Sequence, residues 1–397
     1  MPEDSEQRYL TTAEVAHRLG VKPETVYTYV SRGLLRRVPA KGRRRSLFAL
    51  TEVDRLAARG SESHAPSGAV ERIRSTLTLI DEDELYYRGH RVSELVPEHT
   101  VESVAHLLWT GKLTEQPRFP APEKLVELVR SAATVLPSTA RLSDRLRVAV
   151  AVLGAADPLR FDLTPDAVVH AARSLIGVLV DALPGPSVDG TLGARLWPKL
   201  STLPARPDLL DTALVLLADH GLAVSTVAAR VAASARACVY SVVSAGLGAA
   251  DGHYHGAAST LAYRFLGAAL HDPLAALSEH LRGGNVPGYG HRVYRHRDPR
   301  AEHLLRMLPR TPVVAAVDAV CTELDRRRGE AFPNVDLALA ALAHTCGMGP
   351  DTGEAIFSIA RVVGWTAHAL EEYAEPALRF RPVGVYAGRA GRDRLDS

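Results

Sequence analysis

Residues 287–301 read Pro-Gly-Tyr-Gly-His-Arg-Val-Tyr-Arg-His-Arg-Asp-Pro-Arg-Ala, the segment of the chain that is richest in chemically useful side chains. Gly288 and Gly290 allow the backbone to turn tightly and to approach a ligand closely. His291 follows this turn at once, and four arginines follow it. The composition is that of a binding loop with a candidate catalytic histidine.

Three further segments carry chemically useful side chains. They are Leu-Ala-Asp-His at 217–220, Gly-His-Tyr-His-Gly-Ala-Ala-Ser at 252–259 and Phe-Pro-Asn-Val-Asp at 332–336. A metal site built from His220, His253 and His255 is conceivable, but their spacing matches no standard ligand pattern. Phosphate-binding glycine loops are absent as well. The sequence therefore predicts no metal and no nucleotide-cradling fold.

Composition favours helices throughout the chain of 397 residues. Hydrophobic residues make up 46% and aromatic residues only 6%, so Ala, Leu and Val must build the core, as is typical of an all-α protein. Strand-like segments are confined to 77–80 and 85–89. The longest uncharged apolar run, 237–250, is too short to span a bilayer and predicts a buried core helix. The length suits two or three domains.

The charge is unevenly distributed. Residues 1–60 hold 12 Lys/Arg and 7 Asp/Glu, a net +5, whereas the remaining 35 and 38 give −3. This asymmetry suggests a small module that faces nucleic acid, joined to a larger body. The start, 1–10, is polar and acidic rather than a secretory signal, and the three scattered cysteines fit a reduced compartment, so we expect a cytoplasmic protein.

The first sixty residues predict two short helices joined by a tight turn. Thr11 to Glu14 supplies a helix start, Gly20 a stop, and Pro23 suits the first position of a second helix. Residues 34–38 and 46–50 then predict a hairpin with a cationic tip, and a helix from Thr51 to Arg59 closes the module.

This stretch resembles the winged helix-turn-helix of excisionases and the MerR family. The resemblance implies a domain at 1–60 and a second helix that enters the major groove, with the tip arginines on phosphate. A solvated basic turn on a module that no longer meets DNA is the alternative. The candidate DNA-binding residues are Thr25, Tyr27, Thr28, Arg32, Arg43, Arg44 and Arg45. Residues 61–69 read as a linker.

From about residue 75 to the C-terminus the chain resembles the citrate synthase family. The resemblance rests on Tyr87-Arg88-Gly89-His90, the 288–300 stretch, Pro-Asn-Val-Asp at 333–336, Ala-Arg-Val-Val-Gly-Trp at 360–365 and Arg381-Pro382, in family order. It implies a helical body at 70–397, with a small domain at roughly 257–350 that closes over substrate. It also implies a homodimer.

The resemblance assigns roles to individual residues. Asp336 would be the base that removes a proton from an acyl-CoA, His255 would donate to the thioester oxygen, and His291 would polarise the ketone of a 2-oxo acid. Asp336 also follows Pro333, which looks like the first residue of a helix, so the positive helix end would favour the carboxylate. Substrate binding would fall to His220, Arg300, Arg361 and Arg381, and coenzyme A binding to Gly288, Tyr289, Gly290 and Arg295.

Three positions depart from the family pattern. Gly221 and Ala223 stand where the family usually has Glu and Asn, and Ser259 replaces an amide. These changes could enlarge the site or weaken it, whereas the positions of the three principal catalytic residues are intact.

Three functions therefore remain open. The first is a Si-type citrate synthase, an acyltransferase of the tricarboxylic acid cycle that uses acetyl-CoA and oxaloacetate without metal or other cofactor. A 2-methylcitrate synthase that uses propionyl-CoA is a close variant. The third is a DNA-binding transcription regulator with a ligand-sensing body. A module for protein docking or self-association is the alternative interpretation of the N-terminal residues.

Overall fold

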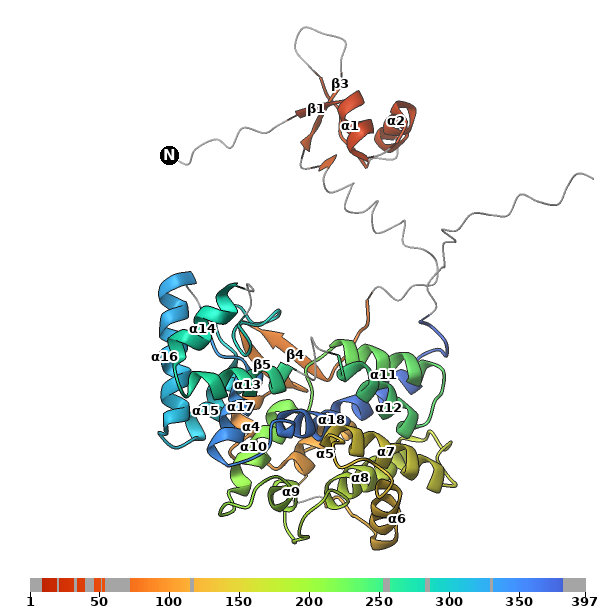
Figure 1. The fold of residues 1–397 in the computed structure, drawn as a ribbon. Helices are drawn as coiled ribbons and strands as arrows, with labels where there is room; N and C mark the ends of the chain where they lie inside the picture. The colour runs from red at the N-terminus through yellow and green to blue at the C-terminus, as the bar shows by residue number, and fades with distance from the viewer. Residues whose placement is uncertain are drawn as a thin grey trace, which may run out of the picture. The chain divides into compact units, whose positions relative to one another are not determined.

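The computed structural model describes residues 9–19, 21–31, 34–39, 46–50, 52–53, 72–114, 118–252, 258–282, 286–328 and 331–380. The chain forms two compact units, residues 1–73 with 379–397 and residues 74–378, and each is described here by itself (Figure 1). The described residues are predominantly helical and the strands are short, so the predicted all-α class is confirmed. No helix of the described residues is both long and apolar enough to cross a membrane.

The N-terminal unit contains the predicted pair of helices. Its elements are β1 (Tyr9–Thr11), α1 (Thr12–Leu19), α2 (Pro23–Ser31), β2 (Val38–Pro39) and β3 (Ser46–Ala49). The Thr11 backbone N–H donates to the Glu14 carboxylate at 2.7 Å, and the Glu14 N–H donates back to the Thr11 hydroxyl at 3.4 Å. This reciprocal capping starts α1 where the sequence predicts it.

Two antiparallel pairings complete this unit. The expected hairpin is present as β2–β3, and β3 also pairs with β1, a strand that the sequence analysis did not predict. Its core is separate from that of the body and consists of Val15, Ala16, Val26, Leu35, Phe48 and Val53. Arg32, the tip arginines Arg43–Arg45, the linker at 61–69 and most of the closing helix lie outside the described residues.

The body begins with a small antiparallel sheet of β4 (Thr78–Asp81), β5 (Glu84–Tyr87) and β6 (His90–Arg91), in the order β4-β5-β6. The helices that follow are α4 (Val92–Leu95), α5 (Val101–Thr110), α6 (Glu123–Ala133), α7 (Leu142–Ala156), α8 (Pro165–Asp181), α9 (Leu192–Leu200), α10 (Pro207–Leu217), α11 (Val224–Ser234), α12 (Val239–Ala250), α13 (Ala258–Ala269), α14 (Pro273–Arg282), α15 (Pro299–Met307), α16 (Pro312–Arg328), α17 (Val335–Thr345) and α18 (Thr352–Ala374).

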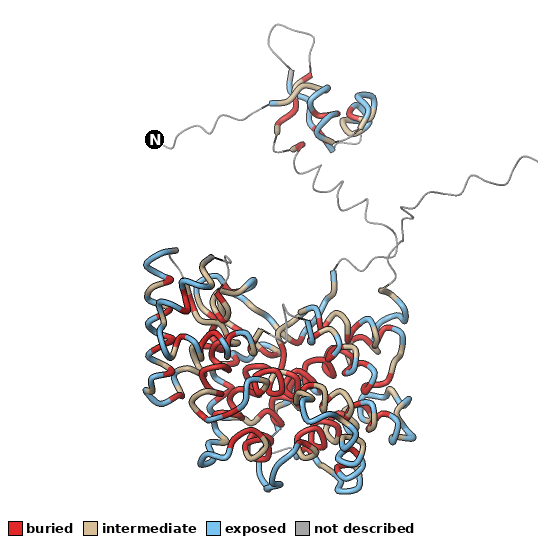
Figure 2. The backbone as a smooth tube through the Cα atoms, in the orientation of Figure 1, coloured by how far each residue is buried: buried red, intermediate tan, exposed pale blue. Residues whose placement is uncertain are grey.

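Helix α18 is the centre of the body, and Figure 2 shows it buried along most of its length. It packs against α10, α11 and α12, among others. At Gly364 it approaches the end of α10 so closely that the Gly364 N–H donates to Ala218 O at 2.9 Å. A Cβ at Gly364 would lie only 2.3 Å from Asp219 Oδ1, so no larger residue fits there without a shift of the backbone.

Helices α13 to α17 gather on one side of the body in Figure 1, with α17 packed against both α13 and α15. They fall in the interval expected for a small closing domain. Their buried residues nevertheless belong to the same continuous core as the rest of the body. The division of the body into two domains stays a prediction.

Candidate active site

Two loops that are distant in sequence pair with each other and bring candidate residues together. The Gly290 N–H donates to Phe332 O, and the Asn334 N–H donates to Gly288 O, both at 2.9 Å. The Asn334 side chain adds a third bond to Gly290 O at 2.9 Å. The pairing is antiparallel, so His291 and Asp336 leave the bridge at opposite ends. Arg300 and Asp298 act on the charge of both residues.

Glycine is required at the centre of this bridge. Gly288 has φ of 83° and Gly290 has φ of 73°, a left-handed backbone that other residues adopt with strain. A Cβ at Gly288 would also lie 2.7 Å from Leu337 Cβ. The predicted tight turn is therefore present. The Tyr289 hydroxyl between the two glycines donates to Val317 O at 3.0 Å, so its phenol packs towards α16.

His291 is held as a neutral imidazole. Its Nδ1 accepts from the backbone N–H groups of Val293, at 3.0 Å, and Tyr294, at 3.3 Å, which assigns the ring proton to Nε2. Burial, aided by the positive charge of Arg300, lowers the pKa of His291 to about 4. At neutral pH this residue can donate one hydrogen bond through Nε2–H without carrying a charge.

His220 lies beside His291. The centroids of the two imidazole rings are 5.2 Å apart, and His220 Nε2 is 3.1 Å from the Tyr294 hydroxyl. His220 is half-buried and lies in the break between α10 and α11. Two predicted ligand-binding histidines thus share one cluster with a buried tyrosine.

Arg300 is buried and paired with Asp298 through two of its three side-chain nitrogens. The guanidinium donates from Nε at 3.0 Å and from Nη2 at 2.8 Å to the two carboxylate oxygens. It also lies 5.2 Å above the ring of Tyr294. Asp298 in turn accepts from the backbone N–H of Val335 at 3.0 Å, which ties the start of α15 to the start of α17.

Asp336 stands in the first turn of α17. Asn334 caps this helix by accepting from the N–H of Asp336 at 3.0 Å, so Pro333 precedes the cap and is not the first helical residue as predicted. The error is one of register, because the Asn334 side chain is the better cap. Burial raises the pKa of Asp336 to about 6, and the charge of Arg300 opposes that rise. A carboxyl group with this pKa can act as a base near neutral pH.

Arg361 differs from Arg300 in having no carboxylate partner among the described residues. Its Nε donates to Leu217 O at 3.0 Å, and its guanidinium lies 4.7 Å above the ring of Phe357. Its Nη1 is buried and has no hydrogen-bond partner among the described residues. Burial lowers the pKa of Arg361 below its ordinary value, although such a group stays charged at neutral pH. A buried cationic donor of this kind suits an anionic ligand.

Comparison with known proteins identifies the larger unit. The family model "Citrate synthase, C-terminal domain" matches residues 68–383, and the model "Helix-turn-helix domain" matches residues 9–61. The chain belongs to the citrate synthase family. Both resemblances noted from the sequence are thereby confirmed.

Both 2-methylcitrate synthases and citrate synthases are similar to this chain. A 2-methylcitrate synthase from Mycobacterium tuberculosis is 29% identical, over 78% of this chain and 86% of that protein. Citrate synthase 2 from Bacillus subtilis is 28% identical, over 81% and 94%. The citrate synthase from Thermoplasma acidophilum, solved as a ternary complex with carboxymethyl coenzyme A and oxaloacetate, gives a TM-score of 0.70 at 25% identity, over 82% of this chain and 96% of that one. The citrate synthase fold is therefore confirmed.

Two expected site residues of this citrate synthase family member, His255 and Arg381, lie outside the described residues. Of the expected coenzyme A residues, Gly288, Tyr289 and Gly290 form the bridge, and Arg295 lies in the loop that follows His291. Their roles stay predictions. Among the described residues, no group of three or more His, Cys, Asp or Glu side chains forms a metal site, and two of the three histidines weighed for one are not described.

Asp219 is a site residue that the sequence analysis missed, although it precedes His220 directly. Its buried Oδ2 accepts from the Thr78 hydroxyl, from the Gly221 N–H at 3.0 Å and from His368 Nε2 at 3.3 Å. Although burial alone would raise it, the His368 ring and other donors lower the pKa of Asp219 to about 2. The available signal was the spacing on α18, where His368 follows Arg361 by two helical turns on the same face.

The His368 ring is itself supported by a buried charge network. Arg230 donates from Nε to His368 Nδ1 at 2.9 Å and pairs with both Glu371 and Glu372. This network fixes His368 with its proton on Nε2, pointing at Asp219. Asp219, the residue before His220, is thus fixed by Thr78 of β4 and by His368 of α18, and Arg230 of α11 orients His368.

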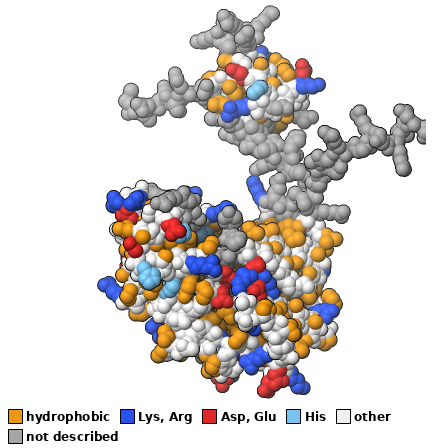
Figure 3. Space-filling model, viewed as in Figure 1, with side chains coloured by type: hydrophobic (Ala, Val, Ile, Leu, Met, Phe, Trp, Pro, Cys, Tyr) orange, Lys and Arg blue, Asp and Glu red, His pale blue; other side chains and the backbone are white. Residues whose placement is uncertain are grey.

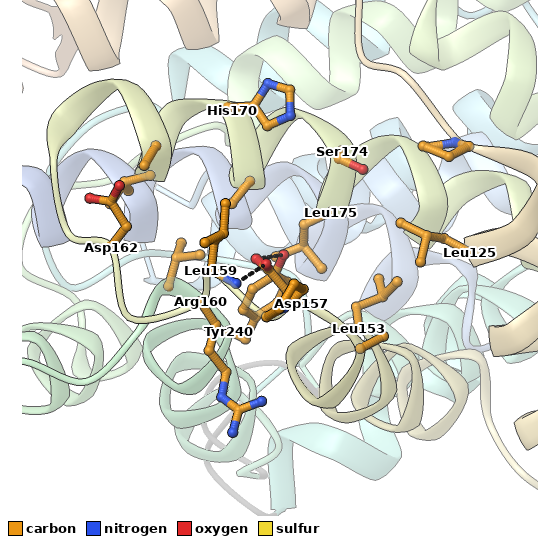
Figure 4. Close-up of a pocket in the computed structure, with 17 residues that line it drawn as sticks. Leu125, Leu153, Asp157, Leu159, Arg160, Asp162, His170, Ser174, Leu175 and Tyr240 are labelled. Carbon is orange, nitrogen blue, oxygen red and sulfur yellow. Dashed lines mark hydrogen bonds between the residues drawn. The ribbon is translucent and has the colours of Figure 1, made fainter.

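An apolar cavity of about 470 Å³ lies elsewhere, lined by residues of α6, α7, α8 and α12 (Figure 4). At its floor the Tyr240 hydroxyl donates to Asp157 at 2.9 Å, and Arg160 donates to Gly154 O at 3.1 Å. It shares no lining residue with the cluster of histidines and arginines. The cavity is therefore separate from the candidate active site.

Proposed function

We propose that this protein condenses an acyl-CoA with oxaloacetate, releasing a citrate and coenzyme A. One observation carries the proposal: a neutral histidine, a carboxyl group with a raised pKa and a buried arginine with an unpaired donor belong to one connected site. Citrate and 2-methylcitrate synthases among the relatives support the same reaction class.

The chemistry begins at Asp336. Its carboxylate removes a proton from the carbon next to the thioester carbonyl, while His255, by resemblance, donates a hydrogen bond to the thioester oxygen. The resulting enol carbon attacks the ketone carbon of oxaloacetate and forms the new carbon–carbon bond. His291 donates its Nε2 proton to the ketone oxygen as that oxygen becomes an alcohol.

Water then cleaves the thioester of the condensed intermediate, which gives the tricarboxylate and the free thiol. Arg361 and Arg300, with Arg381 by resemblance, hold the carboxylates of the 2-oxo acid. Arg361 supports this role because its Nη1 donor is buried with no partner, and a bidentate carboxylate satisfies such a fork.

The acyl preference needs a kinetic comparison. Citrate synthases and 2-methylcitrate synthases both match this chain. Ala223 is a small residue at a position that departs from the family pattern, and Ala257 is a small residue beside a family motif. One methylene is worth only about 1–3 kcal/mol in a pocket. We favour acetyl-CoA and a Si-type synthase, with propionyl-CoA as the alternative.

Thiol release with oxaloacetate and each acyl-CoA tests both proposals, with Asp336→Asn as the isosteric control. We expect release that requires oxaloacetate and a larger kcat/KM for acetyl-CoA. A larger value for propionyl-CoA would assign a 2-methylcitrate synthase instead. A wild-type rate no higher than that of Asp336→Asn would exclude a synthase.

We also propose a homodimer. Hydrophobic side chains gather on the surface over α11 in Figure 3, where Leu222, Val224 and Val231 are exposed. The family resemblance implies a dimer in which Arg381 reaches the partner's site. Light scattering of the purified chain should give twice the mass of 42.7 kDa.

DNA binding is a second candidate function, favoured by the helix-turn-helix unit with its own core. Tyr27 and Thr28 lie exposed on α2, whereas Thr25 is half-buried. We expect the protein to shift the DNA upstream of its own gene, Tyr27→Ala and Arg43–Arg45→Ala to weaken that shift, and Asp336→Asn to leave it unchanged. A shift that no N-terminal substitution affects would reassign the unit to protein docking or self-association.

A further inference from the structure

The turn between β4 and β5 adopts a backbone that its residues disfavour. Asp81 pairs with Glu84, so Glu82 and Asp83 form a two-residue loop, with φ of 48° and 60°. Both values are left-handed, as in the type I′ turns that favour Asn-Gly. Two acidic residues in these positions are strained, and such strain persists where the surrounding contacts hold the residues in place.

Asp83 uses both of its carboxylate oxygens on one distant loop. Oδ1 accepts from the backbone N–H of Arg295 at 2.7 Å, and Oδ2 accepts from that of His296 at 2.8 Å. Glu84, the next residue of the turn, forms an ion pair with Arg297. The tip of the hairpin therefore holds three successive residues of the 291–298 loop.

This loop depends on attachments at its ends and at Asp83. It starts at His291, beside the 288–290 bridge, and it ends at Asp298, which caps α15. Between them, Tyr294 is buried, but Arg292, Val293, Arg295 and His296 are exposed, so little apolar packing fixes the second half of the loop. Two charge-assisted bonds to consecutive amides are therefore a large part of what sets its course.

We propose that Asp83 is a positioning residue for acyl-CoA binding: it holds the backbone at Arg295 and His296 so that this end of the loop is preformed for the coenzyme A moiety. The inference rests on the proposed function and on the role in coenzyme A binding that the family resemblance implies for Arg295. His291 is anchored separately by the bridge, so Asp83 acts on the binding of acyl-CoA rather than on the ketone.

Paired glycine substitutions separate this role from a structural one. Asp83→Gly and Glu82→Gly each relieve one left-handed residue, and Glu82→Gly should therefore melt at a higher temperature than the wild type. Asp83→Gly also loses two hydrogen bonds, so it should melt below Glu82→Gly. Only Asp83→Gly removes the carboxylate. It should raise the KM for acyl-CoA on the order of ten-fold, with kcat and the KM for oxaloacetate within about two-fold. Glu82→Gly should leave all three constants unchanged.

Asp83→Asn provides an intermediate test. Asparagine tolerates the left-handed backbone, but its side chain offers one acceptor oxygen where the carboxylate offers two. We expect a KM for acyl-CoA between those of the wild type and Asp83→Gly. Equal KM values for all variants would overturn the proposal, as would an equal increase in the two glycine variants.

Amide hydrogen exchange tests the contact without any turnover. The amides of Arg295 and His296 should exchange faster in Asp83→Gly, by about ten-fold or more, and also faster in Asp83→Asn. Their exchange rates should be unchanged in Glu82→Gly. Unchanged exchange would show that Asp83 does not hold the loop. A wild-type protein without thiol release would overturn the proposed function, and exchange would still decide whether Asp83 holds the loop.

Discussion

Two groups of charged residues form the candidate active site, and they satisfy their charges differently. In the α15–α17 group (His291, Asp298, Arg300 and Asp336), Arg300 is paired through two nitrogens with Asp298. In the α10–α18 group (Asp219, His220 and Arg361), Arg361 Nη1 and Asp219 Oδ1 are both buried without a hydrogen-bond partner among the described residues. One group is complete by itself, whereas the other is not.

The difference indicates which group binds the charge of the substrate. A buried donor or acceptor without a partner costs about 1–3 kcal/mol, and more when it is charged. Such a cost persists where function uses the group. We therefore infer that the α10–α18 group, through the unpaired donor of Arg361, makes the larger contribution to binding a substrate carboxylate. The α15–α17 group, already ordered, performs the proton transfers, and Arg300 adds to carboxylate binding only with the donors that Asp298 does not use.

The largest expected effect is on turnover in the α15–α17 group. Asp336→Asn keeps the shape of the side chain but removes the base, so kcat should fall by about 10²–10⁴-fold. The KM for oxaloacetate should stay close to that of the wild type, because the α10–α18 group is intact. Steady-state kinetics with each substrate varied in turn measures both constants. If Asp336→Asn raised only the KM for oxaloacetate and left kcat unchanged, the roles in proton transfer and carboxylate binding assigned to the two groups would be wrong.

Replacing Arg300 or Arg361 by methionine should lower the free energy of unfolding by different amounts in the two groups. Arg300→Met leaves Asp298 buried and ionised without its partner, so the free energy of unfolding should fall by about 3–5 kcal/mol. Arg361→Met removes a charge that is only partly paired, so its loss should be smaller, below about 2 kcal/mol, although the KM for oxaloacetate should rise steeply. Urea denaturation at neutral pH compares the two variants. Equal losses would show that Arg361 is as fully compensated as Arg300.

Local patterns in the sequence were enough to predict several features of the structure. Thr11 and Glu14 specify the start of α1 by themselves, and the glycines around Tyr289 specify the turn before His291, because each depends on neighbours within a few residues. Asp336 was placed correctly in the first turn of a helix. Its helix start was misjudged by two residues, because a proline and an asparagine compete for the start.

Contacts between distant segments could not be predicted in this way. The support of Asp219 by His368 exists only because α18 packs against the end of α10 at Gly364, and no periodicity in either helix encodes that crossing. The hydrogen bond from the Arg295 N–H to the Asp83 carboxylate likewise exists only because two distant segments meet in the folded protein. The unpaired donor of Arg361 was equally invisible, because pairing is a property of the folded surroundings rather than of the residue type.

The smallest expected effect is the acid limb of the pH profile, and its slope tests whether the α15–α17 group is ordered as described. Asp336 must be ionised to act as a base, and its pKa is about 6, so kcat/KM should fall about ten-fold for each pH unit below 6. His291 has a pKa of about 4 and stays neutral over that range, so it should add no second proton. The logarithmic plot between pH 4.5 and 6 should therefore have a slope near one. A slope near two would mean that His291 also titrates there, which would require its Nδ1 to lose the two backbone N–H donors that hold the ring neutral.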